Sequence, residues 1–327
     1  MLTFIGLGLC NEYDVSVRGL EAIRQADAVF LEVYTSVLTG TTIPRLEEYY
    51  GKKITPLYRE DVELHPEPIL DAAANGDAVF LTAGDSMVAT THADIRIRAA
   101  ERGIPTRIIH GASITTAVCG LSGLQNYRFG KSVSVPFPYG KWFPMTPIEV
   151  ISANLSQNLH TLVFLDIQKD KERYMRIAEA VDLLEEQASR AGTSIPLSLV
   201  IARAGAEIPL VPAGVANAMR EFESGAPLHI MVVPAERRDV ARDYLQRFAG
   251  FISSITTALS VHTHLLLRVQ RCPHPPRWEQ LPQKFWRWST VMLLMGWYFT
   301  GKAILLMPLH PLLMGTGGWM QVCILGT

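Results

Sequence analysis

Short apolar runs alternate with amphipathic segments through the first 250 residues, and this alternation limits the possible folds more than any other feature of the chain. The apolar runs, which we expect to form strands, cover residues 2–8, 27–34, 52–58, 77–84, 104–110, 159–167, 196–205, 206–213 and 227–234. The amphipathic segments, which we expect to form helices, cover residues 15–26, 87–101, 112–124, 171–189, 215–223 and 236–250. Strands and helices in such alternation build sheets covered by helices. The sequence therefore predicts an α/β fold, in which residues 196–205 and 206–213 pair as neighbouring strands.

The segment from Leu121 to Trp142 differs from its surroundings, because it is rich in glycine, proline and aromatic residues. Stretches of this composition commonly connect domains. We therefore expect an N-terminal α/β domain at residues 1–120, a C-terminal α/β domain at 121–250 and an atypical hydrophobic and basic tail at 251–327.

The tail has a composition of its own, with six basic residues, one acidic residue and five of the six tryptophans of the chain. Residues 290–307 include Lys302 as their single charge and approach the length of a membrane-spanning helix. Against such a helix, Pro308 and Pro311 follow closely, and a mid-span lysine costs about 2.5 to 3.5 kcal/mol. Three explanations stay open: a frameshifted or misassigned gene end, which fits the odd composition best, a membrane anchor, or a disordered or packed extension.

Composition excludes several functional classes. The formal net charge of −1 provides no basic field for nucleic acid or acidic lipid. The four cysteines contain no CxxC pair, and the histidine-rich stretch at residues 262–274 matches no common ligand spacing, so we predict neither a disulfide framework nor a metal site. The chain opens as a strand, without the basic region of a signal peptide. We expect a reduced, cytoplasmic protein.

The first glycine-rich stretch, "GLGLCN" at residues 6–11, only partly matches a dinucleotide-binding loop. That loop needs a third glycine, where this chain has Asn11, and a helix directly behind it. A nicotinamide oxidoreductase is therefore a minor alternative. The stronger expectation is a tight strand exit, where Gly6 or Gly8 lets the backbone pass close to another segment.

A second corner, Gly84-Asp85-Ser86, follows the strand expected at residues 77–84. The simplest expectation is that Asp85 is the N-cap of the following helix, because a carboxylate there accepts orphan amide hydrogens. The alternative, which is compatible with it, is that Gly84 lets the backbone approach a ligand while Asp85 faces the ligand's polar part.

Three further residues carry a structural and a functional interpretation side by side. Ser113 stands where a helix begins, so it either caps that helix or turns its backbone to a ligand. His92 is by default a structural histidine, with acid–base help as the alternative. His229 lies within an apolar strand, where a satisfied core histidine is the commoner case.

Together, segments in the first 250 residues resemble the diphthine synthases, a family in the tetrapyrrole methylase-like class of S-adenosylmethionine methyltransferases. The segments are "FIGLGL", "YTS", "REDVE", "GDSMVATTHADIRIRA", "GKSVSVPFPYGKWFP", "LHTLVFLDI", "ARAG" and "PLHIMVVP". Their form is closer to archaeal than to eukaryotic members, and Ser86 replaces the family's usual proline. The tail from about Phe251 has no counterpart in the family.

The resemblance implies a two-domain tetrapyrrole methylase-like α/β fold, usually a homodimer, with the cofactor in the cleft between the domains. S-adenosyl-L-methionine is the implied cofactor. The contacts to it that carry over from the family are Leu9, Asp85, Val88, Ser113, Ile114, Leu165, Ala204 and His229.

The implied reaction is methylation of the amino group on a modified histidine of translation elongation factor 2. The archaeal type adds three methyl groups, and the eukaryotic type also esterifies a carboxylate. No catalytic base is assigned, although His92 could help. Basic residues near the cleft could meet the protein substrate, solvated charge being the simpler expectation; these are Arg18, Arg59, Lys131, Lys141 and Lys169.

Two alternatives remain besides the nicotinamide enzyme. One is a methylase of tetrapyrrole or cobalamin precursors in the same superfamily, against which "REDVE" and "VATTH" argue. The other is a non-catalytic, membrane-attached binding protein whose tail matters most.

Overall fold

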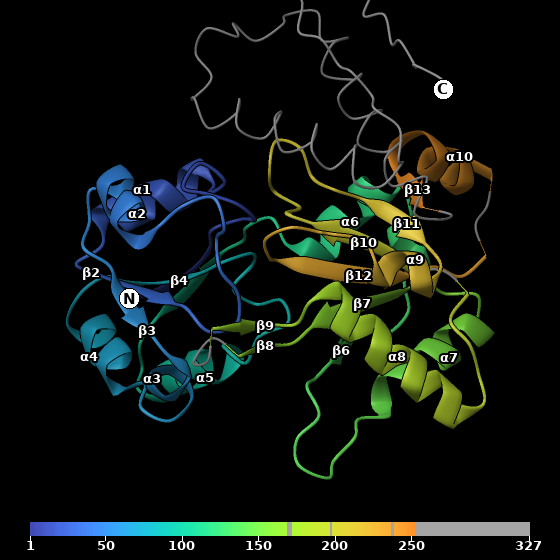
Figure 1. Cartoon of the computed structure of the whole chain (residues 1–327). Coiled ribbons are helices and arrows are strands. Elements are labelled where there is room, and N and C mark those ends of the chain that lie inside the picture. Colours follow the sequence, from blue (N-terminus) through green and yellow to red (C-terminus); the bar gives the residue numbers. More distant parts are fainter. Residues whose placement is uncertain (169–171, 197, 237–238, 253–327) are drawn as a thin grey trace, which may run out of the picture. The chain divides into compact units, whose positions relative to one another are not determined.

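The computed structural model describes residues 1–168, 172–196, 198–236 and 239–252, and Figure 1 shows their arrangement. The tail predictions, including the run at 290–307 and the histidine-rich stretch at 262–274, lie outside the described residues. So does Lys169. No helix in the described part is long and apolar enough to cross a membrane.

The first sheet contains five parallel strands in the order β3-β2-β4-β1-β5. Its strands are β1 (Leu2–Gly6), β2 (Ala28–Glu32), β3 (Thr55–Leu57), β4 (Ala78–Thr82) and β5 (Thr106–Ile109). The helices between them are α1 (Val17–Gln25), α2 (Ile43–Tyr50), α3 (Arg59–Glu63), α4 (Glu67–Asn75) and α5 (Ala93–Glu101). All five residues of β1 and of β4 are buried, as expected for parallel strands covered on both faces.

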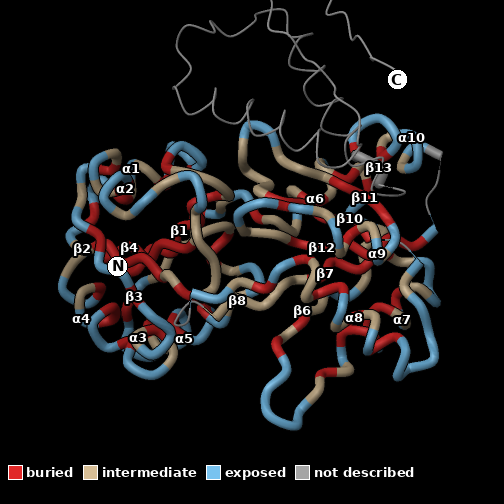
Figure 2. Tube along the Cα trace, viewed as in Figure 1, coloured by how far each residue is buried: buried red, intermediate tan, exposed pale blue. Residues whose placement is uncertain are grey.

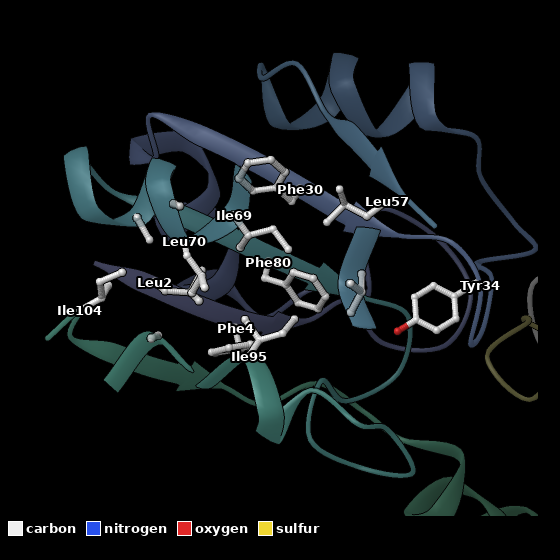
Figure 3. Packing of buried hydrophobic residues seen from close by; sticks show 14 residues of the cluster. Leu2, Phe4, Phe30, Tyr34, Leu57, Ile69, Leu70, Phe80, Ile95 and Ile104 are labelled. Carbon is white, nitrogen blue, oxygen red and sulfur yellow. The ribbon is translucent and has the colours of Figure 1, made fainter. Parts of the chain in front are cut away.

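Two hydrophobic clusters cover the two faces of this sheet. On one face Phe4 and Phe80 pack with their ring centroids 5.7 Å apart, and Ile69 and Leu70 of α4 join them. Figure 3 shows this cluster, with Tyr34 at its rim. On the other face Ile23 of α1 joins a separate buried cluster. The alternating residues of each strand therefore supply two cores at once.

The second sheet contains six strands in the order β13-β11-β10-β12-β7-β6 and is mixed. Its strands are β6 (Val133–Val135), β7 (Thr161–Leu165), β10 (Ser198–Ala202), β11 (Pro212–Gly214), β12 (His229–Val233) and β13 (Gly250–Ile252). Its helices are α6 (Ile114–Ser122), α7 (Thr146–Ser156), α8 (Ile177–Ala191), α9 (Ala216–Arg220) and α10 (Asp239–Phe248). The short strands β8 (Ile167–Gln168) and β9 (Arg173–Tyr174) pair with each other, and η1 (Asn126–Arg128) is a 3₁₀ turn.

Buried residues concentrate along the strands of both sheets, as Figure 2 shows in red. Both sheets belong to one compact unit, Met1–His264, so a domain boundary at residue 120 stays a prediction. Helix α6 follows β5 in the chain, yet its Val118 packs with Leu199 and Ile201 of β10. The first 122 residues therefore supply part of the core beneath the second sheet.

The structure confirms the α/β class and the pairing of β10 with β11, which is antiparallel. Every predicted strand has an observed counterpart, but the one expected at 206–213 is only Pro212–Gly214. Two predicted helices begin too early. The helix expected at 87–101 begins at Ala93, because residues 87–92 form turns and Ala89 has a positive φ of 57°. The helix expected at 171–189 begins at Ile177, because Arg173 and Tyr174 pair in β9.

Several elements had no counterpart among the predictions. Strand β6 lies inside the stretch expected to connect the domains, and β13 follows the last predicted helix. Helices α2, α3, α4 and α7 were also missed. These elements are short or carry proline near their first turn, which weakens a periodic signal.

Candidate active site

Three loops meet at the carboxyl edge of the first sheet, and their backbones touch. Gly8 and Gly84 form an isolated β-bridge, in which the Gly84 N–H donates to the Gly8 carbonyl at 2.6 Å. A Cβ placed on Gly6 would stand 2.5 Å from the Gly84 carbonyl oxygen and 2.6 Å from the Gly111 nitrogen. The expectation of a tight strand exit at Gly6 and Gly8 is therefore confirmed.

The segment after these glycines is a turn and not a phosphate-binding helix start. The Asp14 carboxylate accepts the Cys10 N–H at 2.6 Å and closes the turn, and α1 begins only at Val17. A dinucleotide loop would present a helix N-terminus at this point. The local fold therefore disfavours the nicotinamide alternative.

Asp85 ties the loop after β4 to the loop after β5. Its Oδ1 accepts the Met87 N–H at 2.9 Å, while Oδ2 lies 2.8 Å from His110 Nδ1 and accepts the Gly111 N–H at 3.3 Å. The prediction that Asp85 is a helix N-cap is wrong, because the next helix begins at Ala93. Its carboxylate instead closes the turn at Met87 and joins the loops after β4 and β5.

A cavity of about 680 Å³ opens where these loops meet the second sheet. The first sheet contributes the segments after β1, β2 and β4 and the helix α3, and the start of α6 joins them. The second sheet contributes the ends of β7 and β10 and the start of β12, which share one edge because β12 runs antiparallel to both. A cavity of this size, built at strand ends, is typical of small-molecule sites in α/β proteins.

All of the residues predicted as cofactor contacts line this one cavity. They are Leu9, Asp85, Val88, Ser113, Ile114, Leu165, Ala204 and His229. The structure thus brings together positions that are as much as 220 residues apart in the chain. Their contact with a cofactor stays a prediction.

The structure confirms that Ser113 caps a helix, and the contact of its backbone with a ligand stays a prediction. Its side chain is the N-cap of α6, since Oγ accepts the Thr115 N–H, and the residue also lines the cavity. His92, by contrast, is structural. Its ring is fully buried, its Nδ1 lies 2.9 Å from the Ser86 carbonyl oxygen, and it does not line the cavity. Burial lowers the pKa of His92 below its ordinary value.

His229 differs from the satisfied core histidine that its apolar strand suggested. It begins β12 and lines the cavity, and neither ring nitrogen finds a hydrogen-bond partner within the described residues. Burial lowers the pKa of His229, against a smaller opposite effect of the nearby Ser224 backbone. The imidazole is therefore neutral, and both of its nitrogens are buried at the cavity wall.

The loop after β10 closes this side of the cavity. A Cβ on Gly205 would stand 2.6 Å from the Leu9 Cβ, so this loop touches the loop after β1. Arg203 has a positive φ of 52°, and its Nη1 donates to the Ser224 carbonyl at 2.8 Å. Ala89, on the opposite wall, also has a positive φ. Non-glycine residues held in this region concentrate at ligand sites.

A polar cluster lines another part of the same cavity. Arg59 and Glu63 on α3 form an ion pair of 2.9 Å, and the Arg59 guanidinium stands 4.8 Å from the centre of the Tyr34 ring. The Tyr34 hydroxyl is buried near Thr91, and burial raises the pKa of Tyr34 to about 12. Sequence reasoning identified Arg59 as a residue near the cleft but missed Tyr34 and Glu63.

The other basic residues expected near the cleft do not line the cavity: Arg18, Lys131 and Lys141 are exposed elsewhere. Asp166, at the end of β7, lines it and was missed, although ligands gather at the carboxyl ends of strands. In the described ranges no group of three or more metal-ligating side chains is arranged around a common point.

Comparisons with known proteins agree on one family. The family model described as Tetrapyrrole (Corrin/Porphyrin) Methylases matches residues 1–207. A diphthine synthase of Methanocorpusculum labreanum is 76% identical over 250 residues, which are 76% of this chain and 99% of that protein. A diphthine synthase of Methanosphaerula palustris is 63% identical over 250 residues, again 76% of this chain and 99% of that protein. A crystal structure of diphthine synthase, 41% identical, superposes with a TM-score of 0.71 and covers 79% of this chain and 98% of the other.

The relatives match along almost their whole length, and the match leaves about a quarter of this chain uncovered. The extent of the match agrees with the expectation that the family ends near residue 250. By sequence and by fold, the chain belongs to the diphthine synthase family within the tetrapyrrole methylases.

Proposed function

We propose that this chain transfers methyl groups from S-adenosyl-L-methionine to the amino group of the diphthamide precursor on a histidine of translation elongation factor 2. Its family makes it a methyltransferase of diphthamide biosynthesis. The observation that carries the donor assignment is the convergence of the predicted contacts, from Leu9 to His229, on one cavity.

The walls of the cavity suit a donor held by shape and backbone groups. A Cβ on Gly84 would meet nothing within 4 Å, so the backbone there is open to a ligand. The orphan nitrogens of His229 and the amide groups at the start of α6 offer polar partners, while Leu9, Leu165 and Ile114 offer apolar surface. S-adenosylmethionine supplies a methyl group that its sulfonium has already activated.

Residues of this chain must provide the other requirements of the transfer. They must exclude water and hold the acceptor nitrogen about 3 to 3.5 Å behind the methyl carbon. The nitrogen–carbon bond then forms as the carbon–sulfur bond breaks. A free amine is mostly protonated near neutral pH, so one proton must leave the nitrogen before each transfer. Burial in a cleft disfavours the charged amine and so favours the reactive form.

Three further features belong to the same proposal: addition of three methyl groups, a homodimer and a cytoplasmic location. Trimethylation requires room for a growing group, and a cavity of about 680 Å³ provides it. The methylation of tetrapyrrole or cobalamin precursors is less supported, because the relatives at 76% and 63% identity are diphthine synthases. A membrane-attached binding role would depend on residues outside the described ranges.

The experiment that tests the proposal incubates the full chain with isotopically labelled S-adenosylmethionine and elongation factor 2 carrying the unmethylated precursor. We expect a mass gain of three methyl groups on the modified histidine. The matched control replaces that elongation factor with one whose histidine is unmodified, and a porphyrinogen serves as the alternative acceptor. Transfer to the porphyrinogen alone, or no transfer at all, would overturn the proposal.

A further inference from the structure

The polar cluster of Tyr34, Arg59 and Glu63 is not needed to explain donor binding. Tyr34 follows β2, whereas Arg59 and Glu63 are the first and last residues of the short helix α3. Because residues four apart lie on one face of a helix, both α3 side chains reach the same part of the cavity. None of the three is among the predicted donor contacts.

Arg59 has N–H donors that its ion pair with Glu63 does not use. Its Nη1 donates to Glu63 Oε1 at 2.9 Å, which leaves the Nε and Nη2 edge of the guanidinium for a second partner. The side chain is 61% exposed, so a molecule entering the cavity can reach that edge. Arg203 is the other arginine among the described cavity residues, and its Nη1 is already bound to the Ser224 carbonyl.

The guanidinium is also held in orientation. It lies 4.8 Å from the centre of the Tyr34 ring, at a distance where a cation is attracted to an aromatic face. Tyr34 itself is only 6% exposed and packs into the core of the first sheet, so its ring is a fixed platform. A planar donor fixed by a ring and an ion pair is suited to bidentate binding of a carboxylate.

The charges around the cavity limit where a carboxylate can bind. Three carboxylates line its described walls: Glu63, Asp85 and Asp166. They repel an incoming carboxylate everywhere except beside a cation. Asp85 and Asp166 each already accept a backbone N–H, and neither forms an ion pair with an arginine or lysine in the described residues.

We propose that Arg59 binds the carboxylate of the acceptor's amino-acid group and thereby turns the neighbouring amine toward the methyl donor. The inference rests on the proposed function, because the acceptor of that reaction carries both the amine that is methylated and the carboxylate that the eukaryotic type esterifies. Arg59 is a positioning residue in this scheme. Glu63 and Tyr34 hold its guanidinium in place.

The test measures methyl transfer by the full-length Arg59→Met and Arg59→Lys variants, with donor binding measured separately by calorimetry. We expect kcat/KM for the acceptor protein to fall about 10- to 100-fold in Arg59→Met, the loss typical of a charge-assisted hydrogen-bonded pair. The acceptor KM should rise, because the carboxylate contact is lost, and kcat should also fall, because the amine is no longer turned toward the methyl group. The kcat/KM of Arg59→Lys should lie between those of the unmodified chain and Arg59→Met, because lysine keeps the positive charge but cannot form two parallel hydrogen bonds with a carboxylate.

Two controls separate positioning from folding. Arg98→Met removes an ion pair of the same spacing, Arg98 with Asp94 at 2.7 Å on α5, outside the cavity, and should leave transfer unchanged. Added methylguanidinium should restore transfer to an Arg59→Ala variant, because it supplies the missing guanidinium group. Urea at the same low concentration has a similar shape but no charge, so it should not restore transfer.

The outcomes are distinct. Transfer by Arg59→Met within about twofold of the unmodified chain overturns the proposal. Loss of donor binding in both Arg59→Met and Arg59→Lys overturns it as well, because Arg59 would then be structural. If the unmodified chain transfers no methyl group, the proposed function itself fails.

Discussion

The two walls of the cavity are built on different principles. The wall from the first sheet rests on a backbone frame: parallel strands end side by side, and glycines at positions 6, 8, 84 and 111 let their loops touch. Side chains such as Arg59 project from this frame into the cavity. The wall from the second sheet presents side chains at the ends of antiparallel strands, notably His229. A substitution at a glycine of the frame should therefore damage the fold, whereas exchange of a side chain such as His229 should change binding while leaving the fold intact.

The reason is that side chains and backbone differ in how far they can adjust to a new atom. A side chain that meets a new atom can change rotamer, but a backbone in contact with two other backbones has no such freedom. The predictions below test this difference, beginning with the largest expected effect.

Gly6→Ala should have the largest effect. Its Cβ would meet the Gly84 carbonyl oxygen at 2.5 Å and the Gly111 nitrogen at 2.6 Å, and neither atom belongs to a flexible side chain. We expect the free energy of unfolding, measured with urea, to fall by about 3 kcal/mol or more, at the upper end of overpacking costs. Donor binding should be lost with it, because all three loops line or adjoin the cavity.

Gly120→Ala is the matched control. Gly120 lies within α6, and a Cβ there would meet nothing within 4 Å, so the substitution should be neutral or stabilise by up to about 1 kcal/mol. A Gly6→Ala protein as stable as this control would show that the loops of the first wall are not in contact.

The second sheet carries a pH dependence through His160, the residue before β7. Its ring is 1% exposed and its Nδ1 accepts the Ala235 N–H at 2.9 Å. Burial lowers its pKa from 6.5 to about 4, with a smaller contribution from Arg128. Because the unfolded chain binds the proton more readily, stability is complete above about pH 6.5 and is lost as the pH falls toward 4.

From pH 7 to pH 5 the loss due to this one group should be about 2 kcal/mol in the free energy of unfolding. His92 and His229 also have lowered pKa values and act in the same direction, so the test compares two proteins over the same pH range. His160→Asn keeps an acceptor for the Ala235 N–H but does not titrate, and its stability should depend less on pH. Parallel curves for the two proteins would contradict the prediction.

The comparison of the two walls also explains what the sequence could predict. Buried strands of the first sheet, such as β1 and β4, are continuous apolar runs and were recognised directly. The start of α5 was not recognised, because Asp85 does not cap this helix. Its carboxylate instead contacts His110 and Gly111, which are 25 and 26 positions away in the chain. No local pattern records such a contact.

The site residues show the same division. The cofactor residues came from a family resemblance, and the fold then brought them to one cavity. Tyr34 and Glu63 lie in the segments "YTS" and "REDVE" that carried the family resemblance, but neither segment indicated that these side chains meet at the cavity. Only the sheet order places α3, which holds Arg59 and Glu63, beside the segment after β2.

Ser113→Ala should have a moderate effect that falls on both fold and binding. Its Oγ caps α6, and loss of an N-cap costs about 1 kcal/mol. Ser16→Ala is the matched variant, since Ser16 caps α1 by accepting the Gly19 N–H at 3.1 Å and does not line the cavity. Both variants should lose similar stability in urea titrations, but only Ser113→Ala should bind the donor more weakly. Equal donor affinities would place Ser113 outside the binding surface.

His229→Phe should have the smallest effect on stability and a clear effect on binding. The imidazole is buried with two unpaired nitrogens, so its removal costs no hydrogen bond within the described residues, and the free energy of unfolding should change by no more than about 0.5 kcal/mol. Donor affinity, measured by calorimetry, should fall about 10-fold, because the ligand loses a hydrogen-bond partner. His92→Phe is the contrasting variant: it removes one of the two hydrogen bonds of the Ser86 carbonyl, which keeps the Thr90 Oγ1 donor at 3.0 Å, so it should cost about 0.5 to 1.5 kcal/mol while its direct effect on donor contacts is nil. If His229→Phe instead destabilised the fold as much as His92→Phe and bound the donor normally, the second wall would be as rigid as the first, and the distinction between a backbone wall and a side-chain wall would fail.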